Sequence, residues 1–215
     1  GYVSRGQLGV TMQTVSDDIV KAFKLDNGAG AAVVDVSPDS GAGRAGIQAG
    51  DIILSYNGQV LQQAADLPPL VGMTKPGSTV PVEILRSGKK QTLDVTISEA
   101  SRDRNAVNNQ IIMPPSKSGS AALGMTVQSL DNDTRKQLGL KSGQGVVIGD
   151  ITGPEAAQAG LQAGDVILMV NQQKVGSMAE FQAATREVKP GSTVLLLVRR
   201  GDQSNFIGLT IPEDK

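Results

Sequence analysis

The stretch AGIQAGDIILSYNG, residues 45–58, decides how the chain is organised, because it recurs as AGLQAGDVILMVNQ at residues 159–172. From Ala45 to Leu54, eight of ten residues are identical to those 114 positions later. A period of that length is too long for a solenoid or propeller unit, so each copy is expected to be a separate domain with its own core. A chain of 215 residues accommodates two domains of about 100 residues each.

The repeated motif is interpreted as scaffold. Its glycines allow a tight turn that packs a short helical segment against the following strand. We expect Asp51 and Asp165 to accept hydrogen bonds from nearby backbone amides and so to fix this corner. The G-x-G-x-x-G match at residues 41–46 lacks the long helix that a dinucleotide site needs, and the second copy does not keep its glycines.

The composition excludes several kinds of site. Without His the chain cannot hold a Ser-His-Asp triad, and without Cys it has no thiol catalysis, disulfide or usual zinc site. We therefore expect no catalytic residue, metal or cofactor in this chain. A net charge of −1 does not suit a nucleic-acid surface. The longest aliphatic run, Val194 to Val198, is far short of the roughly 20 residues of a membrane span.

Hydrophobic periodicity predicts the same order of elements in both copies. This order predicts an α+β fold, in which each copy is a small, mostly antiparallel β-sandwich or barrel capped by two helices. We expect domains at residues 1–100 and 121–215, joined by a polar linker at 101–120. The predicted strands and hairpins are at 7–14, 31–36, 51–56 and 80–97, then 123–127, 146–151, 165–170 and 194–211; the helices are at 17–23, 64–73, 131–138 and 178–188.

The order of a Leu-Gly strand opening, a helix, AGxxAGD, a long helix and a final hairpin resembles that of a PDZ domain. With RGQLGV at residues 5–10, the arrangement resembles the tandem PDZ domains of bacterial Do-like serine endoproteases, the HtrA group that includes DegP and MucD. The resemblance covers nearly the whole chain apart from the linker. It implies the C-terminal, regulatory half of a periplasmic protease that acts in stress response and protein quality control, with a protease domain preceding it.

In that family a PDZ domain holds the free C-terminus of a peptide, which adds as a strand beside the first strand. The resemblance implies that the N–H groups of Leu8, Gly9 and Val10 form a nest for the terminal carboxylate, that Gly9 permits the turn and leaves space for the carboxylate, and that Arg5 adds positive charge. The residues alone leave open that the apolar side chains fill the core and that Arg5 is solvated. The expected site residues of this copy are Arg5, Leu8, Gly9, Val10, Met12, Leu67, Leu70 and Val71.

The second copy differs at the corresponding loop. Arg5 becomes Ser120, so no cation lies near the Leu-Gly pair. Whether this copy binds peptide is left open. In the first copy, Pro68 and Pro69 are tolerated only in a first helical turn, so we expect that helix to begin near Asp66 and to be short. The expected, weaker site residues of the second copy are Leu123, Gly124, Met125, Val127, Phe181, Ala184 and Thr185.

A sheet face of the second copy is a candidate interface. The first copy alternates apolar and polar residues on its final hairpin, whereas the second places Leu195, Leu197 and Phe206 on the face expected to point outward. We expect the linker, the first domain or a neighbouring subunit to cover this face, because such a patch is unusual on a monomer.

The favoured hypothesis is a regulatory region that captures hydrophobic C-termini or extended peptides of misfolded envelope proteins. It would also regulate its own protease domain and support assembly of a homo-oligomer. The alternatives are the PDZ pair of an intramembrane metalloprotease and an architectural module that binds no peptide. The sequence leaves open the peptide preference, the oligomer size and the direction of any allosteric effect.

Overall fold

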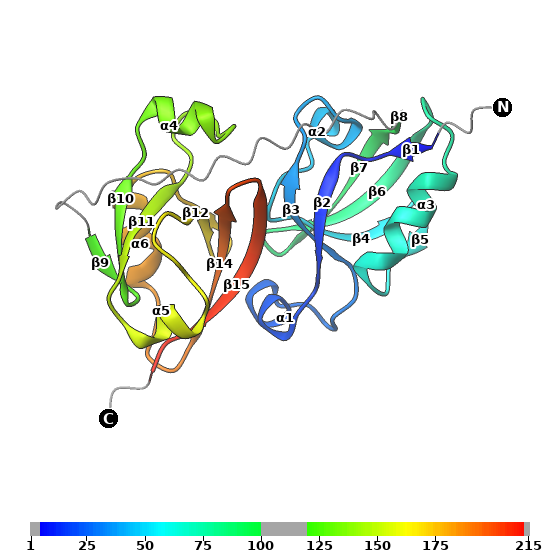
Figure 1. Cartoon of the computed structure of the whole chain (residues 1–215). Helices are drawn as coiled ribbons and strands as arrows, with labels where there is room; N and C mark the ends of the chain where they lie inside the picture. Colours follow the sequence, from blue (N-terminus) through cyan, green and yellow to red (C-terminus); the bar gives the residue numbers. More distant parts are fainter. Residues whose placement is uncertain (1–4, 100–119, 213–215) are drawn as a thin grey trace. The chain divides into compact units, whose positions relative to one another are not determined.

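The computed structural model describes residues 5–99 and 120–212, and the chain divides into two compact units at residues 1–105 and 106–215 (Figure 1). Each unit contains one copy of the repeated motif. The predicted linker lies outside the described residues except for Ser120, which belongs to a strand of the second unit. Within the described ranges, no helix is long and apolar enough to cross a membrane.

The first unit is an antiparallel sheet with short helices (Figure 1). Its main sheet has the order β2-β3-β4-β6-β7; β5 pairs with β4, and β1 pairs with β8 in a separate ladder. The elements are β1 (Gly6–Gln7), β2 (Val10–Thr14), α1 (Asp17–Phe23), β3 (Ala31–Val36), α2 (Gly41–Ala45), β4 (Ile52–Tyr56), β5 (Gln59–Val60), a 3-10 turn (Ala64–Asp66), α3 (Leu67–Met73), β6 (Thr79–Arg86), β7 (Lys89–Thr96) and β8 (Ser98–Glu99).

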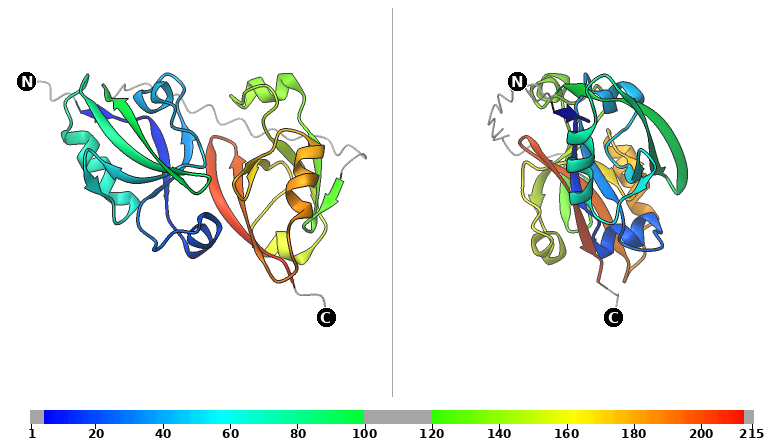
Figure 2. Two further views of the ribbon diagram at one scale, coloured as in Figure 1. Left: turned by 180° about the vertical axis from the view of Figure 1, so that it is seen from behind. Right: turned by 90° about the vertical axis from the view of Figure 1, so that its right-hand side faces the viewer.

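The second unit repeats this order with one more strand at the edge of its sheet. The strand order is β15-β14-β12-β11-β10-β9, and β13 pairs with β12 (Figure 2). The elements are β9 (Ser120–Ala122), β10 (Met125–Ser129), α4 (Asn132–Gln137), β11 (Val146–Ile151), α5 (Pro154–Gln158), β12 (Val166–Val170), β13 (Gln173–Lys174), α6 (Met178–Arg186), β14 (Thr193–Arg200) and β15 (Gln203–Thr210).

Each described unit has the two predicted helices and, in addition, the short helical segment expected before the AGxxAGD corner, which forms one α-helical turn at α2 and α5. The expected starts of the first strands need correction. The strand predicted at 7–14 is broken between β1 and β2 by Leu8 and Gly9. In the second unit the strand begins at Met125, because Leu123 and Gly124 form a turn. The short helix α3 begins at Leu67 with its two prolines in the first turn, as predicted.

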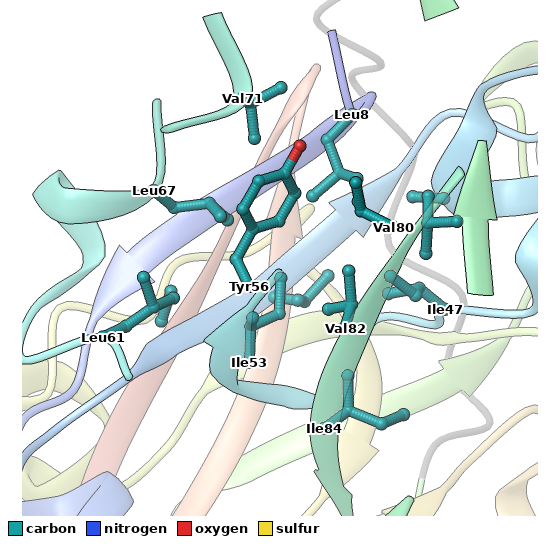
Figure 3. Packing of buried hydrophobic residues seen from close by; sticks show 14 of the residues in the cluster. Leu8, Ile47, Ile53, Tyr56, Leu61, Leu67, Val71, Val80, Val82 and Ile84 are labelled. Carbon is teal, nitrogen blue, oxygen red and sulfur yellow. The ribbon is translucent and has the colours of Figure 1, made fainter. Parts of the chain in front are cut away.

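The core of the first unit is aliphatic, with Tyr56 as the one aromatic member of its main cluster. The ring lies between Leu67 and Leu8 (Figure 3). Its hydroxyl donates to Thr74 Oγ1 at 2.8 Å, and Thr74 Oγ1 donates to Leu70 O at 2.8 Å. These two bonds connect the end of α3 to β4.

The final hairpins of the two units differ in burial. On β6 the buried residues alternate with exposed ones at its start, as the sequence predicts. On β14 the consecutive residues Val194 to Val198 are all buried, so this strand is covered on both faces. Leu195 and Leu197 are each 1% exposed and Phe206 is 6% exposed. Which surface covers these three residues stays a prediction.

Candidate functional site

The main sheet of the first unit ends at β2 on one side and at β7 on the other, and neither terminal strand has a second strand partner among the described residues. β2 pairs only with β3. Val10 lies opposite Val36, and the N–H of Ser37 donates to Gly9 O at 2.9 Å. In an antiparallel ladder, a bond between the residues next to an opposed pair means that the pair itself is not hydrogen-bonded. Val10 and Val36 are therefore such a pair, and the N–H and C=O of Val10 point away from β3. We call this unpaired side of Val10–Thr14 the β2 edge.

The loop before β2 presents further amide donors. The N–H of Ala42 donates to Leu8 O at 3.0 Å, so the carbonyl of Leu8 is used by α2. In the described part of the chain, no acceptor meets hydrogen-bond geometry for the N–H of Leu8 or Gly9. Together with Val10, three successive amides are thus available where the β2 edge begins. Consecutive N–H groups of this kind are what an anion-binding nest requires.

The conformation of Gly9 sets the course of this loop. Its φ of 81° lies in the left-handed region that favours glycine. A Cβ at this position would lie 2.1 Å from Ser40 Cβ, so the missing side chain makes room for the residue that caps α2. The glycine is therefore needed for the turn and for close packing on α2.

The predicted apolar residues divide into two groups. Leu8, Leu67 and Val71 are 4%, 1% and 5% exposed, so they are core residues. Val10, Met12 and Leu70 are half-buried and pack against the same cluster (Figure 3 shows the core members). The structure therefore brings the strand residues and the α3 residues together, and only the half-buried group keeps surface for a ligand. Arg5 is exposed just before β1.

The corresponding strand of the second unit has partners on both sides. β10 pairs with β11 in the same register as β2 with β3, including a bulge at the equivalent position. Its other side pairs with β9. The predicted site residues are here more deeply buried: Met125, Val127 and Phe181 are each 0% exposed, and Ala184 is 5% exposed. Leu123 and Thr185 are half-buried.

The repeated corner behaves as scaffold. Asp51 Oδ2 accepts from the N–H of Gln48 at 2.8 Å, and Asp165 Oδ2 accepts from Gln162 at 2.9 Å, as predicted. Both carboxylates also pair with an arginine of the final hairpin, Arg86 or Arg200, which sequence reasoning missed. The signal was present, because the two arginines are separated by the same 114 positions as the aspartates. Hydrogen bonding to Asp51 raises the pKa of Arg86.

Comparison with known sequences identifies the fold. A sequence model described as "PDZ domain" matches residues 6–97 and again residues 121–210. The chain belongs to the PDZ domain family. Each matched range holds one copy of the AGxxAGD corner, so the tandem PDZ arrangement predicted from the sequence is confirmed.

Curated relatives of these PDZ domains include bacterial proteins named "Probable periplasmic serine endoprotease DegP-like". The one from Pseudomonas putida (strain W619) is 39% identical over 214 residues, covering 99% of this chain and 44% of the relative. The one from Marinomonas sp. is 37% identical over 211 residues, covering 98% of this chain and 43% of the relative. The tandem PDZ chain thus spans less than half the length of these relatives.

Solved structures with similarity to this PDZ chain include HtrA-type proteins. "HtrA-type protease AlgW with decapeptide" is 28% identical, with a TM-score of 0.43, over 46% of this chain and 31% of that one. The "HtrA3 PDZ Domain Bound to a Phage-Derived Ligand" is 27% identical, with a TM-score of 0.39, over 45% of this chain and 88% of that one.

Proposed function

We propose that the first PDZ domain captures the free C-terminus of an extended peptide, which adds as a strand to the β2 edge. The observation that carries this proposal is the combination of an unpaired strand edge with three available amides at its start. An added strand gains main-chain hydrogen bonds along the edge, and its carboxylate accepts from the loop amides. Because the peptide runs antiparallel to β2, its C-terminus lies at the Leu8–Gly9 loop.

Four side chains of the first domain account for the recognition of the last residue of the peptide. Val10, Met12 and Leu70 contact the last side chain of the peptide, because they are half-buried and belong to one apolar cluster. An apolar C-terminal residue therefore fits best. Arg5 is exposed just before β1, three residues ahead of Leu8, and attracts the carboxylate, an effect that salt screens.

The names of the curated relatives support a role for the chain within a larger protease. The chain acts as the regulatory region of a periplasmic serine endoprotease and delivers misfolded envelope proteins to a protease domain of the same protein. Further copies of the chain and that protease domain are its partners. The serine endoproteases among the curated relatives favour this role over the pair of PDZ domains from an intramembrane metalloprotease.

The test is a calorimetric titration with a peptide that ends in a free hydrophobic residue, beside the same peptide amidated at its C-terminus. We expect the free acid to bind and the amide to bind at least tenfold more weakly. Arg5→Ala should weaken binding of the free acid, whereas Lys90→Ala should not, because Lys90 lies on β7 at the opposite edge of the sheet.

Two outcomes contradict this proposal. Equal binding of acid and amide would mean that the domain recognises internal segments without using the carboxylate. Absence of binding by either peptide would favour the architectural alternative, in which the domains build an assembly and hold no ligand.

A further inference from the structure

In the second PDZ domain, a strand of the same chain occupies the position that corresponds to the β2 edge of the first domain. β9 pairs with β10, placing Ala122 opposite Met125 and Ser120 opposite Val127. The opposite side of β10 pairs with β11 as β2 pairs with β3. The side of β10 that β9 covers is therefore the counterpart of the β2 edge.

The position and direction of β9 are those of an added strand. It contacts β10, the counterpart of β2, and α6, the counterpart of α3 (Figures 1 and 2). It runs antiparallel to β10, and its C-terminal residue is the one next to the start of β10. A peptide on the β2 edge, with its C-terminus at the Gly9 loop, would run in the same direction.

The loop that would receive a carboxylate has become a hairpin turn. Leu123 has φ 57° and Gly124 has φ 70°, whereas in the first domain only Gly9 of the Leu-Gly pair has a positive φ. Two positive φ values between paired strands are the mark of a type I′ hairpin turn. In a two-residue hairpin the flanking residues are hydrogen-bonded, so the N–H of Met125 is directed at Ala122.

Burial follows this difference. Val10 and Met12 are half-buried in the first domain, but their counterparts Met125 and Val127 are each 0% exposed. Because β9 pairs with Met125, Thr126 and Val127, this part of β10 has no open edge for an external strand while β9 is in place.

We propose that the second PDZ domain is a strand-binding site that the chain closes on itself, with β9 as its resident occupant. Its external ligand is an extended, non-terminal peptide segment, because β9 itself continues into Leu123 and offers no free carboxylate. Such a segment binds only when β9 leaves β10. This proposal does not depend on peptide binding by the first domain.

Closure by β9 sets the apparent affinity. A site that is competent for only a fraction of the time binds its ligand more weakly by that fraction. A domain that is closed 99% of the time would bind an external strand about 100-fold more weakly than the open domain. Removal of β9 is thus equivalent to activation of a second peptide site.

Amide hydrogen exchange of the unmodified chain gives the first test. The N–H groups of Met125 and Val127 face β9, because these residues form the hydrogen-bonded pairs of the hairpin. We expect them to exchange at least tenfold more slowly than the N–H of Val10, whose edge has no partner strand among the described residues. Equal exchange rates would overturn the proposal.

Two variants change the closure in opposite directions. Ala122→Pro removes the N–H that pairs with Met125 and should open the domain. Ala121→Pro is the matched control, because its N–H points away from β10 in this register. A disulfide between Ala121→Cys and Thr126→Cys should hold β9 on β10 and so keep the domain closed. The two residues are directly opposite in a non-hydrogen-bonded pair, whose Cα atoms are about 4.5 Å apart. The chain has no other Cys.

The probe is a peptide with the sequence of residues 117–123, KSGSAAL, blocked by acetyl and amide groups. NMR shifts at residues 125–129 report the second domain, and those at 10–14 report the first separately. Ala122→Pro should bind the probe at 125–129 at least tenfold more tightly than the unmodified chain and Ala121→Pro. The oxidised cysteine pair should not bind it there, and its Met125 amide should exchange more slowly than in the reduced form.

The proposal is overturned if the oxidised and reduced forms exchange and bind alike, or if opening by Ala122→Pro gives no binding at 125–129. The cysteine pair decides alone if Ala122→Pro does not fold. Loss of C-terminal peptide binding at 10–14 concerns the first domain and leaves this result unaffected.

Discussion

Arg86 and Asp51 form a bidentate ion pair in which Nε–H donates to Oδ1 at 2.7 Å and Nη2–H donates to Oδ2 at 2.5 Å. Arg200 and Asp165 repeat it at 2.6 Å for both bonds. Each arginine also donates to a backbone carbonyl of the AGxxAGD corner, at 2.7 and 2.9 Å. The corner is thereby fixed to the final hairpin in both domains.

Loss of Arg86 should destabilise the first domain. Asp51 is 1% exposed, so Arg86→Ala leaves a buried carboxylate without its cation. We expect a loss of about 3 kcal/mol in the free energy of unfolding. Arg200→Ala should cost less, because the Arg200 side chain is 50% exposed and that of Arg86 is 28% exposed. Urea unfolding measures both, and an equal or reversed order would contradict the role of burial.

The phenol of Tyr56 should make the stability of the first domain sensitive to alkaline pH. Burial raises its pKa above the usual 10.0, while the hydrogen bond to Thr74 opposes that shift. A raised pKa means that the stabilising contribution is complete below pH 10 and is lost as pH rises through the folded pKa. Tyr56→Phe should lose about 1 kcal/mol at neutral pH and lack this additional alkaline loss. Urea midpoints at pH 8 and above pH 10 test it, and parallel pH curves for both proteins would refute it.

Substitutions of Leu67 and Met12 should affect stability and peptide binding to different extents. Leu67 is 1% exposed, so Leu67→Ala should reduce stability by about 2–5 kcal/mol. Met12 is half-buried beside the β2 edge, so Met12→Ala should weaken binding of the hydrophobic C-terminal peptide with a smaller loss of stability. Thermal unfolding and peptide titration of both variants decide the point. If Met12→Ala binds normally, Met12 serves the core alone.

Leu197 should tolerate no charge. It is 1% exposed on β14, so Leu197→Lys places an unpaired ammonium in an apolar site and should cost several kcal/mol, of the order of 3. Its counterpart in the first domain, Glu83, is half-buried, and Glu83→Lys should cost about 0.5 kcal/mol or less. Sedimentation and thermal unfolding of the two variants provide the measurement. Unchanged behaviour of Leu197→Lys would show that this face is open to water in solution.

Much of the fold was predictable because its signals are local or repeated. The alternation of apolar and polar residues predicted β6 and β7, and Pro68 and Pro69 predicted where α3 begins. The repeat of the AGxxAGD motif predicted both corners. The pairs of Asp51 with Arg86 and of Asp165 with Arg200 were missed, since they join residues 35 positions apart and a lone arginine has no pattern of its own.

The candidate sites were only partly predictable. Apolar residues at Leu8, Leu67 and Val71 suit a core and a ligand pocket equally, and only their burial shows that they belong to the core. β9 has three small or polar residues without periodicity, so its strand conformation depends on pairing with β10 and not on its own sequence. The same Leu-Gly dipeptide also adopts different backbone conformations in the two domains.

The attachment of the first loop to α2 has a consequence for kinetics. The carbonyls of Leu8 and Gly9 are held by the amides of Ala42 and Ser37, and α2 is itself anchored where the N–H of Gly41 donates to Ser98 Oγ at 3.1 Å. A loop already fixed in this way loses little conformational freedom when a peptide arrives. Association should therefore proceed in a single phase at similar rates for different peptides, and selection among them should reside in how long each remains bound.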